Sequence, residues 1–239
     1  MYDGEFYNTV TQQMQLYDVG MSSMVVADAE ALAELAEVIE RPLESLMLRA
    51  RAALIRKQIA TNLWDADLYT FTNLFANGTL YPRISPTSFY ALMADASTDE
   101  QADVMTSEWL LNPQRFCVSK DWPLGNSDDC YWGLPSINAQ DPAFPPLGYW
   151  RGYVWGPMAQ LTYWSLQRYD RVPSVRTGRK ALCTQMKAMG MNMWNANRHI
   201  CENFNPHKNA TECTGTKFYH WGALTLLINF IEEGYYTYL

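Results

Sequence analysis

Residues 21–40 read MSSMVVADAEALAELAEVIE, and this stretch decides the fold class. Apolar side chains recur every three or four residues, which places them on one face of an α-helix. The apolar face consists of Ala27, Ala31, Leu35 and Val38. The opposite face carries the glutamates Glu30, Glu34 and Glu37. The pattern predicts an amphipathic helix that buries its apolar face.

A second helix is predicted directly after the first. Pro42 suits the first turn of a helix. Backbone N–H groups there have no partner within the helix, so a proline, which has no N–H, loses no hydrogen bond. Arg49, Arg56 and Lys57 fall on the outer face of this helix. The predicted buried stripe consists of Leu43, Leu46, Met47, Ala50 and Leu54. The short connection makes the two helices an antiparallel hairpin.

Helical periodicity returns along the rest of the chain. Further helices are predicted at 87–94, from Thr98 onwards, and at 154–169, 175–198 and 217–233. Residues 68–72 and the Asn77-Gly78 turn predict one small β-hairpin. Residues 112–149 form a long irregular loop, and such loops in compact domains are commonly functional.

Paired helices with little strand predict an all-α toroid of helical hairpins, with residues 1–239 belonging to one domain. A closed ring of six hairpins needs twelve helices, and the pattern supports seven or eight. We therefore expect an incomplete ring that exposes helix faces to solvent or to another chain.

Composition narrows the possible functions. The formal net charge is −7 and no dense cluster of Lys and Arg occurs, which argues against a nucleic-acid partner. The longest apolar stretch, 221–231, is shorter than the roughly 20 residues that span a bilayer. Zinc-site spacings, a phosphate loop and a dinucleotide fingerprint are missing, so neither a metal nor a cofactor is predicted.

Cysteines and sequons bear on the compartment. Cys117 and Cys130 flank one loop, and Cys201 and Cys213 flank another, at spacings that suit disulfides without fixing the pairing. Cys183 lies in a helical pattern and is expected to be a buried thiol. Asn77-Gly78-Thr79 and Asn209-Ala210-Thr211 are glycosylation sequons. We expect a secretory lumen or a secreted protein, with a cytoplasmic location as the alternative.

Aromatic residues make up 14% of the chain and gather where loops meet helices. Such rings line many carbohydrate sites, because the C–H faces of sugars pack on them, although single rings more often fill a core. The segment 149–158 reads YWRGYVWGPM and places Arg151 between Trp150 and Trp155. A guanidinium there can stack on a ring and donate to hydroxyls or a carboxylate.

Residues 201–206 read CENFNP and set one acid among amide and aromatic groups. Amide donors keep a carboxylate ionised, and an ionised carboxylate can take a proton from water as a general base. A glutamate with a purely structural hydrogen bond is the alternative reading of Glu202.

Four stretches resemble the C-terminal catalytic domain of glycoside hydrolase family 63, the family of processing α-glucosidase I and its bacterial relatives. They follow the family order and are MQLYDVG at 14–20 with ADAEAL at 27–32, PRISPTSFY at 82–90, GLPS at 133–136 leading to YWRG at 149–152, and ENFNP at 202–206 with FYHWGAL at 218–224.

The resemblance implies an (α/α)6 barrel and hydrolysis of α-glycosidic, mainly α-glucosidic, bonds in oligosaccharides with inversion. An inverting enzyme needs one carboxyl group as acid and a second as base. The resemblance makes Glu202 the base. It assigns sugar binding to Tyr149, Trp150, Arg151, Trp155 and Asn203, with Trp64 and Trp221 as further walls.

The family's acid is an aspartate that lies just ahead of the segment corresponding to residue 1. Asp3 is a weak substitute, because its neighbours do not match the family motif. The sequence thus predicts an exo-acting α-glycosidase whose acid lies upstream. Three alternatives stay open: an inactive fragment or carbohydrate-binding module, a trehalase-like hydrolase, and a terpenoid cyclase. The sequence does not predict an oligomeric state.

Overall fold

In a computed structural model, the structure describes residues 6–118, 133–207 and 213–235. Seven α-helices fall in these ranges, within the predicted number: α1 (Val19–Val38), α2 (Pro42–Asn62), α3 (Tyr90–Met93), α4 (Asp99–Met105), α5 (Gly156–Gln167), α6 (Pro173–Asn197) and α7 (His220–Glu232). The remaining elements are short strands. None of the helices in the described ranges combines the length and apolar character needed to cross a membrane.

Helices α1 and α2 form the predicted antiparallel hairpin, but their buried faces differ from the prediction. Small side chains fill the contact between the two helices, including Ala29, Ala33 and Ala36 of α1 and Ser45 and Ala52 of α2. Small residues let the two backbones approach closely. Ion pairs between Glu37 and Arg49 and between Glu30 and Arg56 join one side of the hairpin.

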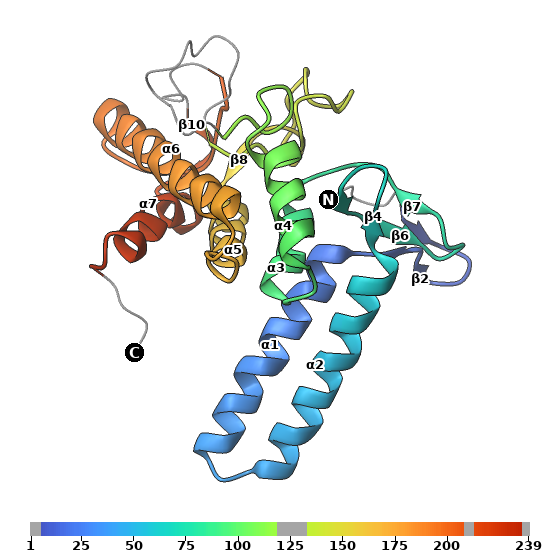
Figure 1. Cartoon of the computed structure of the whole chain (residues 1–239). Coiled ribbons are helices and arrows are strands. Elements are labelled where there is room, and N and C mark those ends of the chain that lie inside the picture. Colours follow the sequence, from blue (N-terminus) through green and yellow to red (C-terminus); the bar gives the residue numbers. More distant parts are fainter. Residues whose placement is uncertain (1–5, 119–132, 208–212, 236–239) are drawn as a thin grey trace.

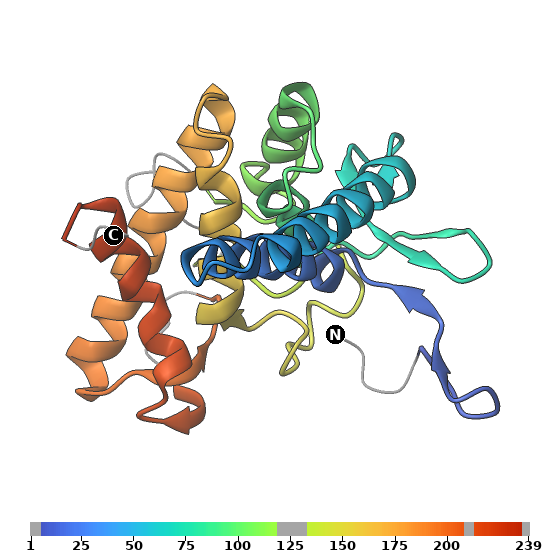
Figure 2. The same ribbon diagram turned by 90° about the horizontal axis from the view of Figure 1, so that it is seen from below.

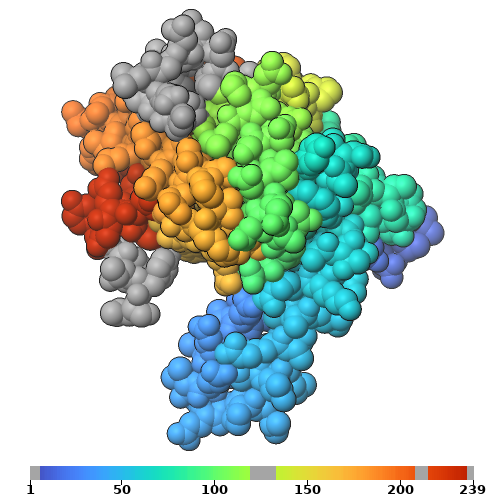
Figure 3. Space-filling model, in the orientation of Figure 1, coloured from blue at the N-terminus to red at the C-terminus, as the bar shows by residue number. Residues whose placement is uncertain are grey.

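The larger apolar side chains of the hairpin point away from this contact. Leu43 is 72% exposed, and Leu35, Val38, Leu46, Met47 and Leu54 are also exposed. The predicted buried stripe of α2 is therefore wrong for this chain, because no described element covers it. Figure 1 shows the hairpin projecting from the other helices, and Figure 3 shows its surface standing clear of the main body.

The remaining helices pack side by side. Helix α1 contacts α3, α3 contacts α5, and α5 contacts both α6 and α7. The view from below shows a row that does not close on itself (Figure 2). The described part of the chain is therefore an incomplete toroid, as predicted.

Helix α4 starts with the N-cap chemistry predicted at Thr98. The Thr98 hydroxyl accepts the backbone N–H of Gln101, and the Gln101 side chain accepts the N–H of Thr98. A π-helical segment, Thr106–Leu110, continues this helix, and a 3-10 turn, Pro86–Phe89, precedes α3.

The predicted β-hairpin exists, but its first strand lies further along the chain. Strands β6 (Asn73–Phe75) and β7 (Leu80–Tyr81) flank the Asn77-Gly78 turn. Strand β5 (Thr70–Phe71), in the predicted segment, pairs instead with β4 (Trp64–Asp65) and is fully buried. Strand β3 (Leu16–Tyr17) pairs with β6, and β1 (Tyr7–Asn8) pairs with β2 (Gln13–Met14).

Three antiparallel strands that the sequence analysis missed lie at one end of α5, α6 and α7 (Figure 1). They are β8 (Val154–Trp155), β9 (Cys201–Phe204) and β10 (Cys213–Lys217), in the order β10-β9-β8. Residues 154–155 and 217 were predicted to be helical. Because they pair with β9, α5 and α7 begin later than predicted.

Two glycines set how closely α5, α7 and this sheet approach one another. A Cβ on Gly156, the first residue of α5, would lie 1.8 Å from the carbonyl oxygen of Trp221. A Cβ on Gly222 would lie 1.9 Å from the carbonyl oxygen of Cys201. Since real Cβ atoms do not come this near to backbone, only glycine allows both contacts.

Gly156→Ala should lower the free energy of unfolding by about 1–3 kcal/mol, because the new methyl group forces α5 away from α7. Thermal unfolding followed by circular dichroism measures this. Glu34→Ala, at an exposed position of α1, is the control and should change the midpoint little. Equal midpoints for the two variants would contradict the proposed steric constraint.

Candidate active site

Glu202 lies on β9, the central strand of the three-stranded sheet. Strand β8 pairs with it on one side, with Trp155 opposite Asn203, and β10 pairs with it on the other. Glu202 is buried, with only 7% of its surface exposed. A carboxylate buried to this degree needs hydrogen-bond donors, and the structure supplies them from two other segments.

Both carboxylate oxygens of Glu202 accept hydrogen bonds. The Tyr149 hydroxyl donates to Oε1, and the backbone N–H of Thr216 donates to Oε2 over 3.0 Å. Gly215 has a φ of +78°, and a Cβ there would lie 2.6 Å from Oε2. The bare backbone of β10 is therefore what lets Thr216 reach the carboxylate.

These bonds keep the carboxylate ionised. The Tyr149 hydroxyl, followed by the Thr216 N–H, lowers the pKa of Glu202 below its usual value, although burial opposes the effect. The same bond to Glu202 raises the pKa of Tyr149 to about 12. At neutral pH the pair is a carboxylate and a protonated phenol. The predicted ionisation of Glu202 agrees with this lowered pKa, and the phenol and the backbone N–H are its two largest causes.

A two-residue turn presents Tyr149 and Trp150. Gly148 and Arg151 exchange backbone hydrogen bonds of 2.8 and 2.9 Å, which leaves Tyr149 and Trp150 at the corners of the turn. The Trp155 indole N–H donates to the carbonyl oxygen of Tyr149 over 2.8 Å. The turn is thus fixed to β8 immediately beside the carboxylate.

Trp150, Trp155 and Trp221 form one aromatic cluster. Trp150 stacks on Trp155 with ring centroids 3.9 Å apart, and Trp221 meets Trp155 at 5.7 Å. Trp155 is fully buried. It supports the cluster from behind and offers no face to a sugar, which corrects its predicted role in direct binding. Trp150 and Trp221 are only partly buried.

Arg151 is the last residue of the turn and is exposed, and its guanidinium lies against Gly148. A Cβ on Gly148 would lie 2.9 Å from the Nε of Arg151. The guanidinium makes no ion pair with any side chain in the described part of the chain. Its charge is therefore available to an anionic or hydroxyl group near Trp150.

The other two predicted residues differ in position. Asn203 is buried next to Glu202, with its side-chain nitrogen near Gly215. Trp64 lies on β4 and packs edge-on against Phe71, with centroids 5.0 Å apart. No described ring contact joins Trp64 to the cluster around Trp150, so the structure does not bring this predicted wall into the site. Asp3 lies outside the described residues.

Sequence reasoning missed the groups that shape the loop before the turn. The Ser136 hydroxyl accepts the N–H of Gly152 over 2.9 Å, and Arg83 pairs with the buried Asp141 over 3.1 Å. Arg83 and Asp141 belong to two of the recognisable stretches, which was a usable signal. Thr216 acts on Glu202 through its backbone N–H and, more weakly, through its side chain, and no sequence pattern marked it.

The cysteines agree with the predicted chemistry as far as they are described. Cys117 and Cys201 are disulfide-bonded, and Cys183 is a free, buried thiol. Burial raises the pKa of Cys183 to about 12, so this thiol is unreactive. Cys130 lies outside the described residues. Within the described ranges, no group of three or more His, Cys, Asp or Glu could hold a metal ion.

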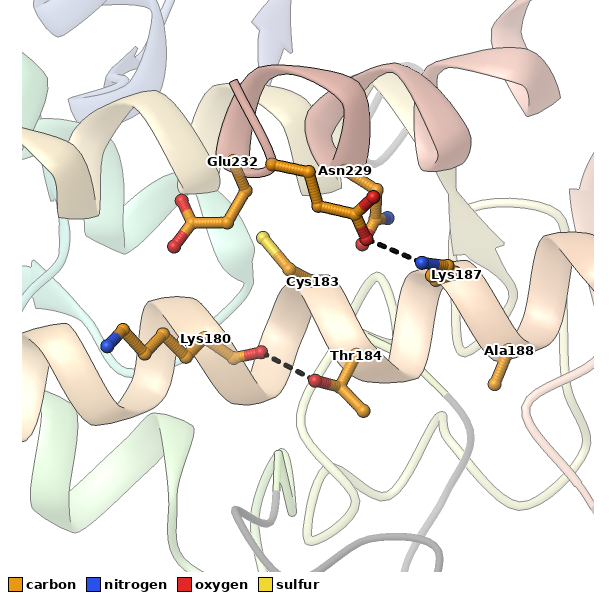
Figure 4. A pocket seen from close by; sticks show the side chains of 8 residues that line it. Lys180, Cys183, Thr184, Lys187, Ala188, Asn229 and Glu232 are labelled. Atoms are coloured by element: carbon orange, nitrogen blue, oxygen red, sulfur yellow. Dashed lines mark hydrogen bonds and ion pairs between the residues drawn. The ribbon is translucent and has the colours of Figure 1, made fainter. Parts of the chain in front are cut away.

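A separate hollow of about 620 Å³ lies between α6 and α7 (Figure 4). Charges of both signs line it: Lys180 and Lys187 come from α6, and Lys187 pairs with Glu233 at the end of α7. Cys183 lies in its wall. None of the predicted sugar-binding residues lines this hollow, so it is distinct from the site around Glu202.

Comparisons with solved structures identify the fold. The GH63 mannosylglycerate hydrolase from Thermus thermophilus, in complex with glucose, matches with a TM-score of 0.63 and 19% identity, over 89% of this chain and 47% of that one. Neutral trehalase from Saccharomyces cerevisiae matches with a TM-score of 0.64 and 17% identity, over 98% and 41%. A sialidase matches with a TM-score of 0.71 and 12% identity, over 97% and 22%.

These likenesses confirm the predicted (α/α)6 glycosidase type of fold. The chain spans about half the length of the first of these structures. No curated protein matches the chain. A family model, the mannosylglycerate hydrolase MGH1-like glycoside hydrolase domain, matches residues 2–222. The chain therefore belongs to the MGH1-like glycoside hydrolases of family 63.

Proposed function

We propose that this chain carries the general base and part of the sugar pocket of an inverting, exo-acting α-glycosidase. One observation carries the proposal: Glu202 is buried, ionised and bonded to Tyr149 beside the ring cluster of Trp150 and Trp221. Inversion requires a base of this kind on the face of the sugar opposite the leaving group.

In the proposed reaction, Glu202 takes a proton from a water molecule while the oxygen of that water bonds to the anomeric carbon. The bond to the leaving oxygen breaks, and an acid returns a proton to that oxygen. Oε1 uses one lone pair on the Tyr149 hydroxyl, and its second lone pair can accept a hydrogen bond from the attacking water. We assign the role of the acid to the aspartate of the family's acid motif.

Arg151 and the rings suit a small glycoside. Partly buried Trp150 and Trp221 can pack on the C–H face of one sugar ring. The unpaired guanidinium of Arg151 can bind a carboxylate on the other half of the substrate. The substrate we propose is an α-mannosyl or α-glucosyl glycoside of a small hydroxy acid, such as mannosylglycerate, in place of the neutral α-glucosyl oligosaccharides that the sequence analysis favoured.

A silent carbohydrate-binding module is the second candidate. It is favoured by the partly buried rings of Trp150 and Trp221 beside the exposed Arg151, which can bind a sugar without cleaving it. Incubation with mannosylglycerate, an aryl α-glucoside and trehalose separates the candidates: released sugar with inverted configuration supports the hydrolase, and saturable binding without release supports the module.

Glu202→Gln should lower turnover by about 10²–10⁴-fold, because an amide cannot accept the proton from water. The measurement is kcat on the best substrate of the panel, in a protein that also supplies the acid. Circular dichroism should show an unchanged fold, since the amide is close in shape to the carboxylate. Turnover near the wild-type rate would refute the assignment of Glu202.

Arg151→Ala should raise KM for a carboxylate-bearing glycoside by about 10-fold or more, because a hydrogen bond to a charged group contributes about 1.5–3 kcal/mol. KM for a neutral aryl glycoside should change less. Arg176→Ala, which removes an exposed arginine of α6 paired with Asp170, is the matched control. Equal effects of Arg151→Ala on both substrates would contradict a role in binding the carboxylate.

A further inference from the structure

We propose that Tyr149 is a positioning residue, whose hydroxyl fixes the carboxylate of Glu202 and couples it to the aromatic cluster. This inference rests on the proposed function, because it matters to turnover only if Glu202 is the base. The sequence resemblance assigned Tyr149 to sugar binding alone.

The first argument is geometric. The Tyr149 hydroxyl donates directly to Oε1, while the backbone oxygen of the same residue accepts the N–H of Trp155. The Tyr149 ring meets that of Trp155 edge-on at 4.6 Å and that of Trp150 at 5.5 Å. A ring held at this many points cannot leave the carboxylate without disturbing the cluster.

The second argument is electrostatic. Tyr149 is the largest cause of the lowered pKa of Glu202, ahead of the Thr216 N–H. Tyr219 is the other titratable group that acts on the pair, and it raises the pKa of Tyr149. The phenol thus keeps its proton at neutral pH and stays a donor. Loss of the hydroxyl leaves Thr216 as the one remaining residue that donates to Glu202 among the described residues, and burial then favours the protonated acid more strongly.

Tyr149→Phe tests the inference without needing turnover. Carbon NMR of labelled glutamate side chains follows the titration of Glu202, whose signal is the one missing in Glu202→Gln. The phenylalanine variant should raise the pKa of Glu202, because the donor that lowers it most is lost. Because a base works only when ionised, the acidic limb of a kcat/KM profile should move up in pH by the same amount.

Tyr153→Phe is the matched control. It also removes a tyrosine hydroxyl from this segment, but that hydroxyl makes no hydrogen bond to Glu202 among the described residues. It should leave the titration unchanged. Equal Glu202 titrations in Tyr149→Phe and wild type would overturn the positioning role. That result would leave the proposed function standing, which fails only if Glu202→Gln keeps its turnover.

A second inference rests on a different part of the molecule: we infer that Asn77 accepts an N-linked oligosaccharide. Asn77 lies exposed at the tip of the β6–β7 hairpin. Its Oδ1 accepts the N–H and the hydroxyl of Thr79, at 3.0 and 2.7 Å, which leaves the amide nitrogen without a described partner. Nothing lies within 4 Å of a Cβ built on Gly78, so a bulky sugar fits beside it.

The disulfide-bonded Cys117 and Cys201 support a lumenal or secreted location, where such transfer takes place. In the transfer, the Asn77 amide nitrogen bonds to the anomeric carbon of a lipid-linked oligosaccharide. The lipid diphosphate leaves, and the nitrogen loses one proton.

Protein isolated from its natural source tests this site directly. Peptide N-glycosidase converts a glycosylated asparagine to aspartate, so mass spectrometry of the peptide containing residue 77 should find Asp after digestion and a glycan before it. An undigested peptide that already carries unmodified Asn77 throughout would overturn the inference. Asn209 lies outside the described residues. Mass spectrometry of the peptide that contains it reports on that second sequon independently.

Discussion

Helices α5 and α7 begin against backbone that only glycine can approach. Gly156 lies under the carbonyl oxygen of Trp221, and Gly222 lies under that of Cys201. These contacts bring the end of β8, the whole of β9 and the first turn of α7 into one place. Trp155, Glu202 and Trp221 are direct chain neighbours of these glycines or of the carbonyls they contact, so the steric constraint sets their separation before any side-chain interaction does.

Within that frame, the central strand of the sheet fixes the chemistry of Glu202. The backbone N–H and C=O groups of β9 are taken up by pairing with β8 and β10. The Glu202 carboxylate therefore receives its hydrogen bonds from other segments of the chain. Tyr149 comes from a turn more than fifty residues earlier, and Thr216 from the next strand. Because both donors favour the ionised form, the site combines a carboxylate with an aromatic cluster directly beside it.

The α1–α2 hairpin shows a different balance. Alanines and a serine fill the contact between its helices, and Glu37 with Arg49 secures one side. Leucines and methionine that would normally be buried remain exposed. This exposure agrees with the incomplete toroid that the described residues form. The match to the first solved structure likewise covers about half of that structure's chain. These side chains have the apolar character that is usual for a buried helix face.

The sequence alone determined the fold class, the helix order and the candidate base, because helical periodicity is a local property and the motif around Glu202 is compact. It misplaced the buried stripe of α2, since periodicity identifies an apolar face without showing what covers it. It also assigned Trp64 and Trp155 to the sugar pocket. Only the tertiary structure decided that Trp155 supports the cluster from behind, that Trp64 packs on Phe71, and that Tyr149 bonds to Glu202. Contacts between residues so far apart along the chain depend on how the sheet and helices meet, which no local pattern records.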